Sequence, residues 1–161
     1  MYWLCFDQVS VREDLPVYST VLILNTTDSD ISPEVAYYIV SGNVQNVFGV
    51  HQSSGKLFLA SKLDRETYQS YRLNITAFDG AYTASAFVDV EVTDVNDNRP
   101  VCEQSFLRIN VFEDEQVGSK LVTINASDID DDSNNGIMFW GHSYFDVFTI
   151  EKNNGLLFYI C

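Results

Sequence analysis

An internal repeat with a period of 100 residues constrains the fold of this chain more than any other feature. Three blocks keep the same register: 11–14 with 111–114, 24–30 with 124–130, and 47–50 followed by 55–58 with 147–150 followed by 155–158. The second copy ends at Cys161, the counterpart of Ser61. We therefore expect one complete repeat with its linker, residues 1–98, followed by a truncated one, residues 99–161, that lacks its last strands.

The hydrophobic pattern within the first repeat is typical of β-strands. Short runs rich in Val, Ile, Phe and Tyr are separated by Gly, Asp, Ser or Pro, and no segment has a sustained helical period. Apolar positions alternate from Tyr71 to Ala77 and from Ala84 to Val92. Strands are predicted at 6–12, 19–25, 35–40, 47–51, 56–60, 71–78 and 82–93. Seven short strands in about a hundred residues predict an all-β fold, a Greek-key β-sandwich, present in tandem.

Charge and composition narrow the possible partners. A formal charge of −14 argues against nucleic acid and anionic membrane surfaces, which favour basic patches, and it is compatible with cation binding. A hydrophobic content of 46% is ample for a packed core. The sequence has neither a signal-peptide pattern at its N-terminus nor an apolar run that approaches the ~20 residues of a membrane helix.

The cysteines and the glycosylation sequons indicate in which cellular compartment the protein is found. Three cysteines, Cys5, Cys102 and Cys161, are too few for a disulfide framework and have no zinc-like spacing. Three Asn-X-Ser/Thr sequons support an extracellular origin and predict glycosylation at Asn25, Asn74 and Asn125. We expect a piece of a longer extracellular or cell-surface protein, attached to the membrane only through the parent chain.

An acidic stretch from Asp94 to Pro100 joins the two copies. In an extended backbone, Asn96 and Asn98 point to one face and Asp97 to the opposite face. Calcium takes about six to eight oxygen ligands from carboxylates, amides and carbonyls, so this stretch could hold cations on both flanks. From these residues alone, an acidic loop without metal remains equally open.

The chain resembles, over essentially its whole length, the extracellular repeats of the cadherin superfamily. The motifs that carry the resemblance stand in order and at domain spacing. They are Glu13, Asp28-Ser29-Asp30, Leu63-Asp64-Arg65-Glu66, Ala77-Phe78-Asp79-Gly80, Asp94-Val95-Asn96-Asp97-Asn98, Glu113, Asp128-Ile129-Asp130 and Asn134-Asn135-Gly136. The resemblance implies a calcium-dependent cell–cell adhesion module, with calcium ions where one sandwich meets the next. It also implies other cadherin repeats as homophilic or heterophilic partners, with no small-molecule substrate and no nucleic acid.

The resemblance further implies the calcium ligands. The ions nearer the first repeat would be held by Glu13, Asp64, Glu66, Asp97, the Val95 carbonyl and a bridging Asp130. The remaining ion would be held by Asn96, the Asn98 carbonyl, Asp128, Asp130 and a carbonyl near Asn134. An aspartate equivalent to Asp79 would fall beyond Cys161, so this last site is expected to be weakened or empty.

Five alternatives or side issues accompany this interpretation. Asp64 and Glu66 resemble the paired carboxylates of a glycosidase, but the recurrence of the acidic loops favours a structural role, and we expect no enzyme. A soluble truncated fragment or isoform that binds a partner without productive adhesion is the alternative function. Trp3 is expected to be a core or edge aromatic rather than an anchor for strand exchange, and Cys102 a buried free thiol. The second repeat is expected to be much less stable than the first.

Overall fold

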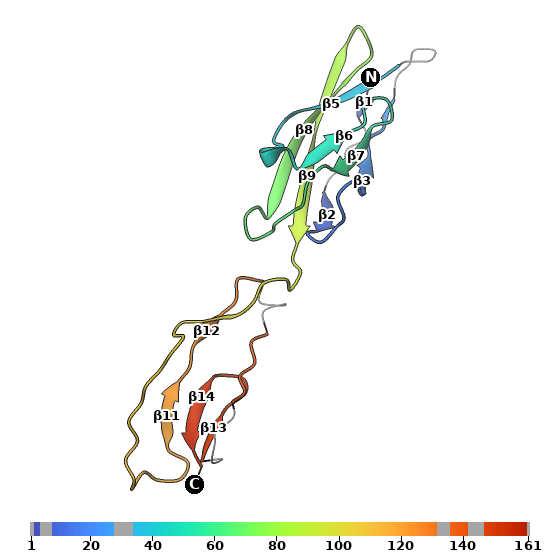
Figure 1. Cartoon of the computed structure of the whole chain (residues 1–161). Coiled ribbons are helices and arrows are strands. Elements are labelled where there is room, and N and C mark those ends of the chain that lie inside the picture. The colour runs from blue at the N-terminus through green and yellow to red at the C-terminus, as the bar shows by residue number, and fades with distance from the viewer. Residues whose placement is uncertain (1, 4–7, 28–33, 132–135, 142–146, 161) are drawn as a thin grey trace. The chain divides into compact units, whose positions relative to one another are not determined.

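The computed structural model describes residues 2–3, 8–27, 34–131, 136–141 and 147–160. The chain divides into two compact units, residues 1–95 and 96–161, which are described separately below (Figure 1). The described residues form strands, with one 3-10 turn at Val44–Asn46, and the predicted all-β class is confirmed. No helix among them has the length and apolar character needed to span a membrane.

Unit 1 is built from two main sheets and one short strand pair (Figure 1). The larger sheet has the order β2–β9–β8–β5, with β2 at Val9–Arg12, β9 at Thr83–Thr93, β8 at Ser70–Phe78 and β5 at Ala36–Ser41. The smaller has the order β3–β7–β6, with β3 at Thr20–Ile23, β7 at Lys56–Leu59 and β6 at Phe48–Val50. The pair joins β1 at Tyr2–Trp3 to β4 at Thr26–Thr27. All these pairings are antiparallel except that of β2 with β9, which is parallel.

The core of unit 1 lies between the two sheets, as the alternation in the sequence predicts. In β8 the buried residues are Tyr71, Leu73, Ile75 and Ala77, and the residues between them are not buried. One cluster of buried side chains joins these positions with residues of the smaller sheet, including Leu57 and Leu59. The remaining buried apolar members are Val11, Leu24, Tyr37, Val47, Phe48, Leu63, Val88, Val90 and Val92.

The predicted strand at 19–25 is interrupted at Leu24. The Leu24 N–H donates to the Gly55 carbonyl (2.8 Å), and this contact separates β3 from β4. Gly55 has a φ of +64°, and a Cβ at this position would lie 2.6 Å from the Leu24 oxygen. Only glycine fits a close backbone approach of this kind without strain, so the turn between β6 and β7 depends on it.

Unit 2 repeats the smaller sheet of unit 1 at an offset of 100 residues. Its sheet has the order β11–β14–β13, with β11 at Lys120–Thr123, β14 at Leu156–Tyr159 and β13 at Phe148–Ile150. A short pair joins β10 at Val101–Cys102 to β12 at Ala126–Ser127. Even the register shift recurs, since it lies between Thr20 and Leu22 in unit 1 and between Lys120 and Val122 in unit 2.

The rest of the larger sheet has no counterpart among the described residues of unit 2. Residues 109–112, the counterparts of β2, form no strand there. In unit 1 β2 pairs only with β9, whose counterpart positions lie past residue 161. A strand needs a paired neighbour for its backbone groups, which explains why this stretch of the repeat is not regular.

The expectation of a buried Cys102 is wrong, because the thiol is free and exposed. Strand β10 pairs on one edge with β12, and both of its residues are exposed. The described segment that follows it, residues 103–110, is exposed as well, so it covers neither side chain. Cys5 and Cys161 lie outside the described residues. The backbone of Trp3 pairs with Thr26, and nothing is described of its side chain.

Candidate metal centre

The centre of the candidate site in unit 1 is Glu13, which directly follows β2. Its own N–H donates to the Thr93 carbonyl at the end of β9 (3.1 Å). Its Oε2 accepts a hydrogen bond from the Arg65 N–H (2.8 Å), and its Oε1 accepts one from the Val95 N–H (2.8 Å). The residue is only 6% exposed. One carboxylate thus holds together the end of β2, the loop at 64–68 and the segment that leaves β9.

Asp64 is placed by a turn that it caps itself. The buried Leu63 anchors the start of this loop in the core. Asp64 Oδ1 accepts from the Thr67 N–H (3.0 Å), Oδ2 accepts from the Thr67 hydroxyl (2.9 Å), and the Asp64 carbonyl accepts from the Tyr68 N–H (2.9 Å). This is the local side-chain-to-backbone bonding that favours aspartate in turns. The cap orients the carboxylate while leaving the residue exposed.

Three carboxylates of unit 1 meet in one place. Glu13, Asp64 and Glu66 each offer an oxygen, and these three oxygens lie within 4.8 Å of one another. Calcium–oxygen distances are about 2.3–2.6 Å, so two ligands of one ion can be up to about 5 Å apart. The three oxygens therefore fit a single calcium ion. Without a cation, two such charges about 4 Å apart repel by ~1 kcal/mol in water and ~4 kcal/mol at an effective dielectric of 20.

An ion pair that the sequence reasoning did not anticipate stands next to these ligands. Arg65 Nη1 lies 3.3 Å from Asp94 Oδ1, and both side chains are largely buried. Asp94 is not among the predicted ligands, and the sequence identifies Arg65 only as part of a motif. The signal in the sequence is a single basic residue between two acidic ones, Asp64 and Glu66.

Unit 2 gathers a second set of oxygen-bearing side chains within its own residues. Asn98 donates from its backbone N–H to Asp130 Oδ2 (3.3 Å) and from Nδ2 to Asp130 Oδ1 (2.8 Å). Asn98 Nδ2 also donates to Asp97 Oδ1 (3.0 Å). The Asp130 N–H donates to Asp128 Oδ1 (3.2 Å), a turn of the Asx type. These contacts bring together four predicted ligand residues: Asp97, Asn98, Asp128 and Asp130.

The other predicted site residues are less constrained by the described contacts. The Val95 N–H donates to Glu13, whereas the predicted ligand is the Val95 carbonyl. Asn96 is an exposed loop residue whose ligand role stays a prediction, and Asn134 lies outside the described residues. Among the sequons, Asn25 and Asn125 have exposed side chains in equivalent loops, and Asn125 Nδ2 donates to Glu103 (3.2 Å). Asn74 lies within β8.

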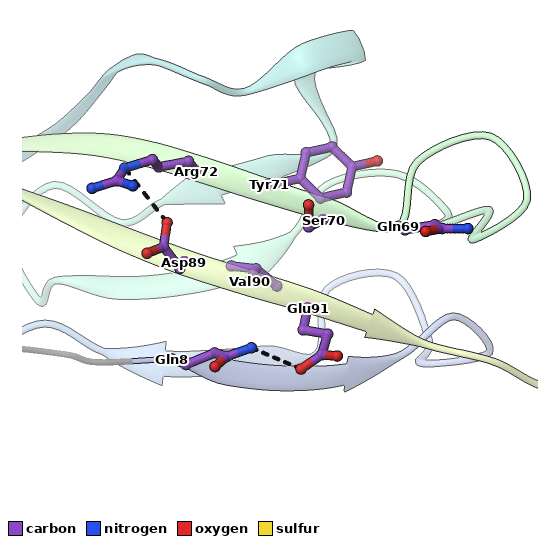
Figure 2. Close-up of a pocket in the computed structure, with 8 residues that line it drawn as sticks. All are labelled: Gln8, Gln69, Ser70, Tyr71, Arg72, Asp89, Val90 and Glu91. Carbon is purple, nitrogen blue, oxygen red and sulfur yellow. Dashed lines mark hydrogen bonds and ion pairs between the residues drawn. The ribbon is translucent and has the colours of Figure 1, made fainter.

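A separate hollow on the outer face of β8 and β9 is no part of this centre (Figure 2). Its polar side chains contact one another, because Gln8 Nε2 donates to Glu91 Oε2 (2.7 Å) and Arg72 Nε lies 3.7 Å from Asp89 Oδ1. Neither Glu13 nor Asp64 lines it. The three carboxylates of Glu13, Asp64 and Glu66 converge and offer only oxygen atoms. They are thus the feature described in unit 1 with the clearest ligand chemistry.

Comparisons with known proteins identify the family of the chain. The family model described as "Cadherin domain" matches residues 7–93. The chain is 38% identical over 135 residues to human "Protocadherin Fat 1". The aligned region covers 81% of this chain and 3% of the relative. It is 35% identical over 158 residues to human "Cadherin-23", covering 92% of this chain and 5% of the relative.

A solved structure, human Protocadherin-24 EC1-2, is similar with a TM-score of 0.83 and 27% identity. The match covers 99% of this chain and 76% of that one. The chain spans only 3% to 5% of the length of the curated relatives that it matches.

Proposed function

Because the chain belongs to the cadherin family, we propose that it is a calcium-dependent cell–cell adhesion module in which calcium rigidifies the junction between tandem extracellular repeats. Cadherin repeats are adhesion-type modules of the cell exterior, which supports this role and an extracellular or cell-surface location. The observation that carries the calcium dependence is the convergence of Glu13, Asp64 and Glu66 oxygens within 4.8 Å. The partners that we propose are other cadherin repeats, in homophilic or heterophilic contacts.

The proposed ligands form two groups. In unit 1 they are Glu13, Asp64, Glu66 and the Val95 carbonyl, and in unit 2 they are Asn96, Asp97, Asn98, Asp128, Asp130 and Asn134. Support comes from the hydrogen bonds that cluster each group within its own unit. The covalent boundary adds to it, since Val95 ends one unit and Asn96 begins the next. We propose that the same ions take oxygens from both groups.

The proposed mechanism follows from the charge of these groups. In the absence of a cation the carboxylates repel each other, which favours separation of the chain segments that carry them. Bound calcium supplies two positive charges and attracts the carboxylates of these segments to a common centre. Glu13 is already fixed by two backbone N–H groups, so it can hold an ion with little further ordering. A row of repeats stiffened in this way can present a distal adhesive surface.

The test compares calcium binding by two charge-neutralising variants. Asp64→Asn removes a proposed ligand charge, whereas Asp14→Asn removes the charge of an exposed residue that pairs with Arg12 (2.7 Å) and is no proposed ligand. Extracellular calcium modules bind at about 10⁻⁴–10⁻³ M, so about 2 mM calcium is expected to stabilise the wild type by roughly 1–2 kcal/mol. Melting temperature and cleavage of the 90–100 stretch by a protease are measured with calcium and with EDTA at matched ionic strength.

We expect calcium to raise the melting temperature and to slow cleavage in the wild type and in Asp14→Asn. In Asp64→Asn both effects should require a several-fold higher calcium concentration. The proposal is wrong if calcium changes neither quantity, or if the two variants lose the response equally.

A further inference from the structure

The outer face of the larger sheet in unit 1 carries an apolar patch around one asparagine. In β8, Asn74 lies between the buried Leu73 and Ile75, so its side chain belongs to the face that points away from the core. The exposed fractions of the apolar side chains on this face are 52% for Phe87 and 55% for Val40. With Tyr38, which is 40% exposed, these two residues form what we call the Asn74 patch.

The sheet register places Asn74 within this patch. Asn74 stands directly opposite Phe87 of β9 on one side and Ser41 of β5 on the other. Tyr38 stands opposite Thr76, and the register shift between Ile39 and Ser41 includes Val40. Opposite residues of antiparallel strands have Cβ atoms about 4.5–5.5 Å apart. A group attached to the Asn74 side chain would therefore lie against Phe87.

The amide of Asn74 gains little from its surroundings. Its Oδ1 is covered and accepts no hydrogen bond from any described residue. Asparagine is also depleted in strand interiors, and here it occupies the middle of a nine-residue strand. Asn74-Ile75-Thr76 is at the same time an acceptor sequence for N-linked sugar. A glycosylation acceptor and an exposed apolar patch are thus found at one position, and a sugar attached to the acceptor would cover the patch.

We propose that Asn74 carries an N-linked glycan whose first sugar residues pack on the Asn74 patch, with the Phe87 ring as the platform. In the transfer, Nδ2 loses one proton and forms a C–N bond to the anomeric carbon of N-acetylglucosamine. The donor is a lipid-pyrophosphate-linked oligosaccharide, and the lipid pyrophosphate is the leaving group. The C–H groups on one side of a pyranose ring form an apolar face, which suits an exposed aromatic ring. The guanidinium of Arg72 lies over one face of the Phe87 ring, 4.8 Å from its centroid, so the sugar would pack against the other face.

The fold also fixes when the sugar must be added. Asn74 and Thr76 belong to a strand that is paired along both edges, and the Thr76 hydroxyl is hydrogen-bonded to Ser85 Oγ (2.8 Å). The backbone and the Thr76 hydroxyl of the acceptor sequence are therefore engaged in hydrogen bonds, and not accessible for sugar transfer, once β8 and β9 have paired. Since β9 follows β8 in the chain, transfer must precede the formation of this hairpin. Asn25 itself lies in an exposed loop, and the threonines of its acceptor sequence, Thr26 and Thr27, are paired only with the two-residue strand β1. The proposal rests on the extracellular location proposed above, and it is independent of calcium binding.

The experiment uses the chain secreted from mammalian cells. Site occupancy at Asn74 and Asn25 is measured by mass spectrometry of glycopeptides, and we expect Asn74 to be occupied. The melting temperature is then measured for the wild type, Asn74→Gln, Phe87→Ser and the double variant, all in EDTA and after trimming each glycan to one N-acetylglucosamine. Loss of the sugar should lower the melting temperature by roughly 2–4 °C in the wild-type background and by much less in the Phe87→Ser background.

Asn25→Gln is the matched control, because its sugar lies in a loop away from the patch and its loss should leave the melting temperature unchanged. An unoccupied Asn74 in secreted protein whose Asn25 is occupied would overturn the proposal, and would leave the patch as a protein-binding surface. Equal effects of Asn74→Gln in both backgrounds would overturn the packing on Phe87. Failure of the calcium proposal would instead appear as an absent calcium response with Asn74 fully glycosylated.

Discussion

At the scale of single residues, Glu13 shows how one carboxylate can both stabilise a fold and offer ligand atoms. Its two oxygens each accept a backbone hydrogen bond, from Arg65 and from Val95, yet a carboxylate has about four lone-pair sites and retains acceptor capacity. Asp64 is different, because its oxygens are bound locally by Thr67. Loss of the negative charge should therefore change the free energy of unfolding by different amounts at Glu13 and at Asp64.

Glu13→Gln is expected to lower the free energy of unfolding of unit 1 by about 1–3 kcal/mol even in EDTA, because an NH₂ group replaces one acceptor and faces a backbone N–H. Asp64→Asn should cost less than about 1 kcal/mol, since one oxygen and an NH₂ group can still bond to Thr67. Urea denaturation of both variants in EDTA measures the difference. Equal losses would show that Glu13 does not hold the three segments together.

Tyr71 makes the stability of unit 1 depend on pH in the alkaline range. Burial raises the pKa of the Tyr71 phenol, and the nearby Tyr68 and Asp64 raise it further. The neutral phenol is thus favoured in the fold, and its contribution to stability is fully present below the unfolded pKa of about 10 and is lost as the pH rises through the folded pKa. Tyr71→Phe should make the loss of stability above about pH 10 less steep.

Melting temperatures from pH 8 to pH 11 test this, with Tyr82→Phe, the removal of an exposed phenol, as the control. If Tyr71→Phe and Tyr82→Phe change the slope by the same amount, the burial of Tyr71 does not govern the alkaline transition.

At the scale of elements, the sequence predicts strands better than it predicts their partners. The alternation in β8 and β9 identified both strands, because one face of each is buried and the other is not. The interruption at Leu24 could not be predicted, since it depends on a hydrogen bond to Gly55, far away in the sequence. The absence of a strand at 109–112 fits the expected lack of the last strands, because the repeat preserves the residues of β2 but not the neighbour with which β2 pairs.

The repeat also offers matched positions in β7 and β14. Leu57 and Leu157 have the same pairing partners at an offset of 100 residues, but Leu57 is fully buried and Leu157 only partly. Leu57→Ala should destabilise unit 1 by about 2–5 kcal/mol, and Leu157→Ala should destabilise unit 2 by less than half as much. Amide exchange in each variant reports each unit separately. Similar costs would mean that β14 is packed as well as β7.

At the scale of the whole molecule, the family was accessible from the order and spacing of acidic motifs, and the comparisons confirm it. Oxygens of Glu13, Asp64 and Glu66 lie within 4.8 Å of one another in unit 1, and the role of these residues as calcium ligands stays a prediction. The Arg65–Asp94 pair was missed, because the sequence contains no sign of which acid an arginine contacts. The chain divides between residues 95 and 96, within the acidic stretch, and the assignment of 1–98 and 99–161 as two cadherin repeats stays a prediction.

The net charge of −14 also acts on the whole molecule. Self-repulsion among exposed carboxylates is screened by any salt, with a Debye length of about 10 Å at 0.1 M ionic strength. A cation bound by specific oxygens acts in addition to this screening. Matched ionic strength is therefore what separates the two effects in the calcium experiment.

The parallel pairing of β2 with β9 has a mechanical consequence. Val9 pairs with Val90 and Arg12 with Thr93, so the chain enters this sheet at one end of the strand pair and leaves it at the other. Tension applied through the two ends of unit 1 pulls β2 and β9 in opposite directions along their common axis. The hydrogen bonds between them are then loaded in shear and must fail together, instead of opening one after another. Unit 1 would therefore resist such tension at this strand pair.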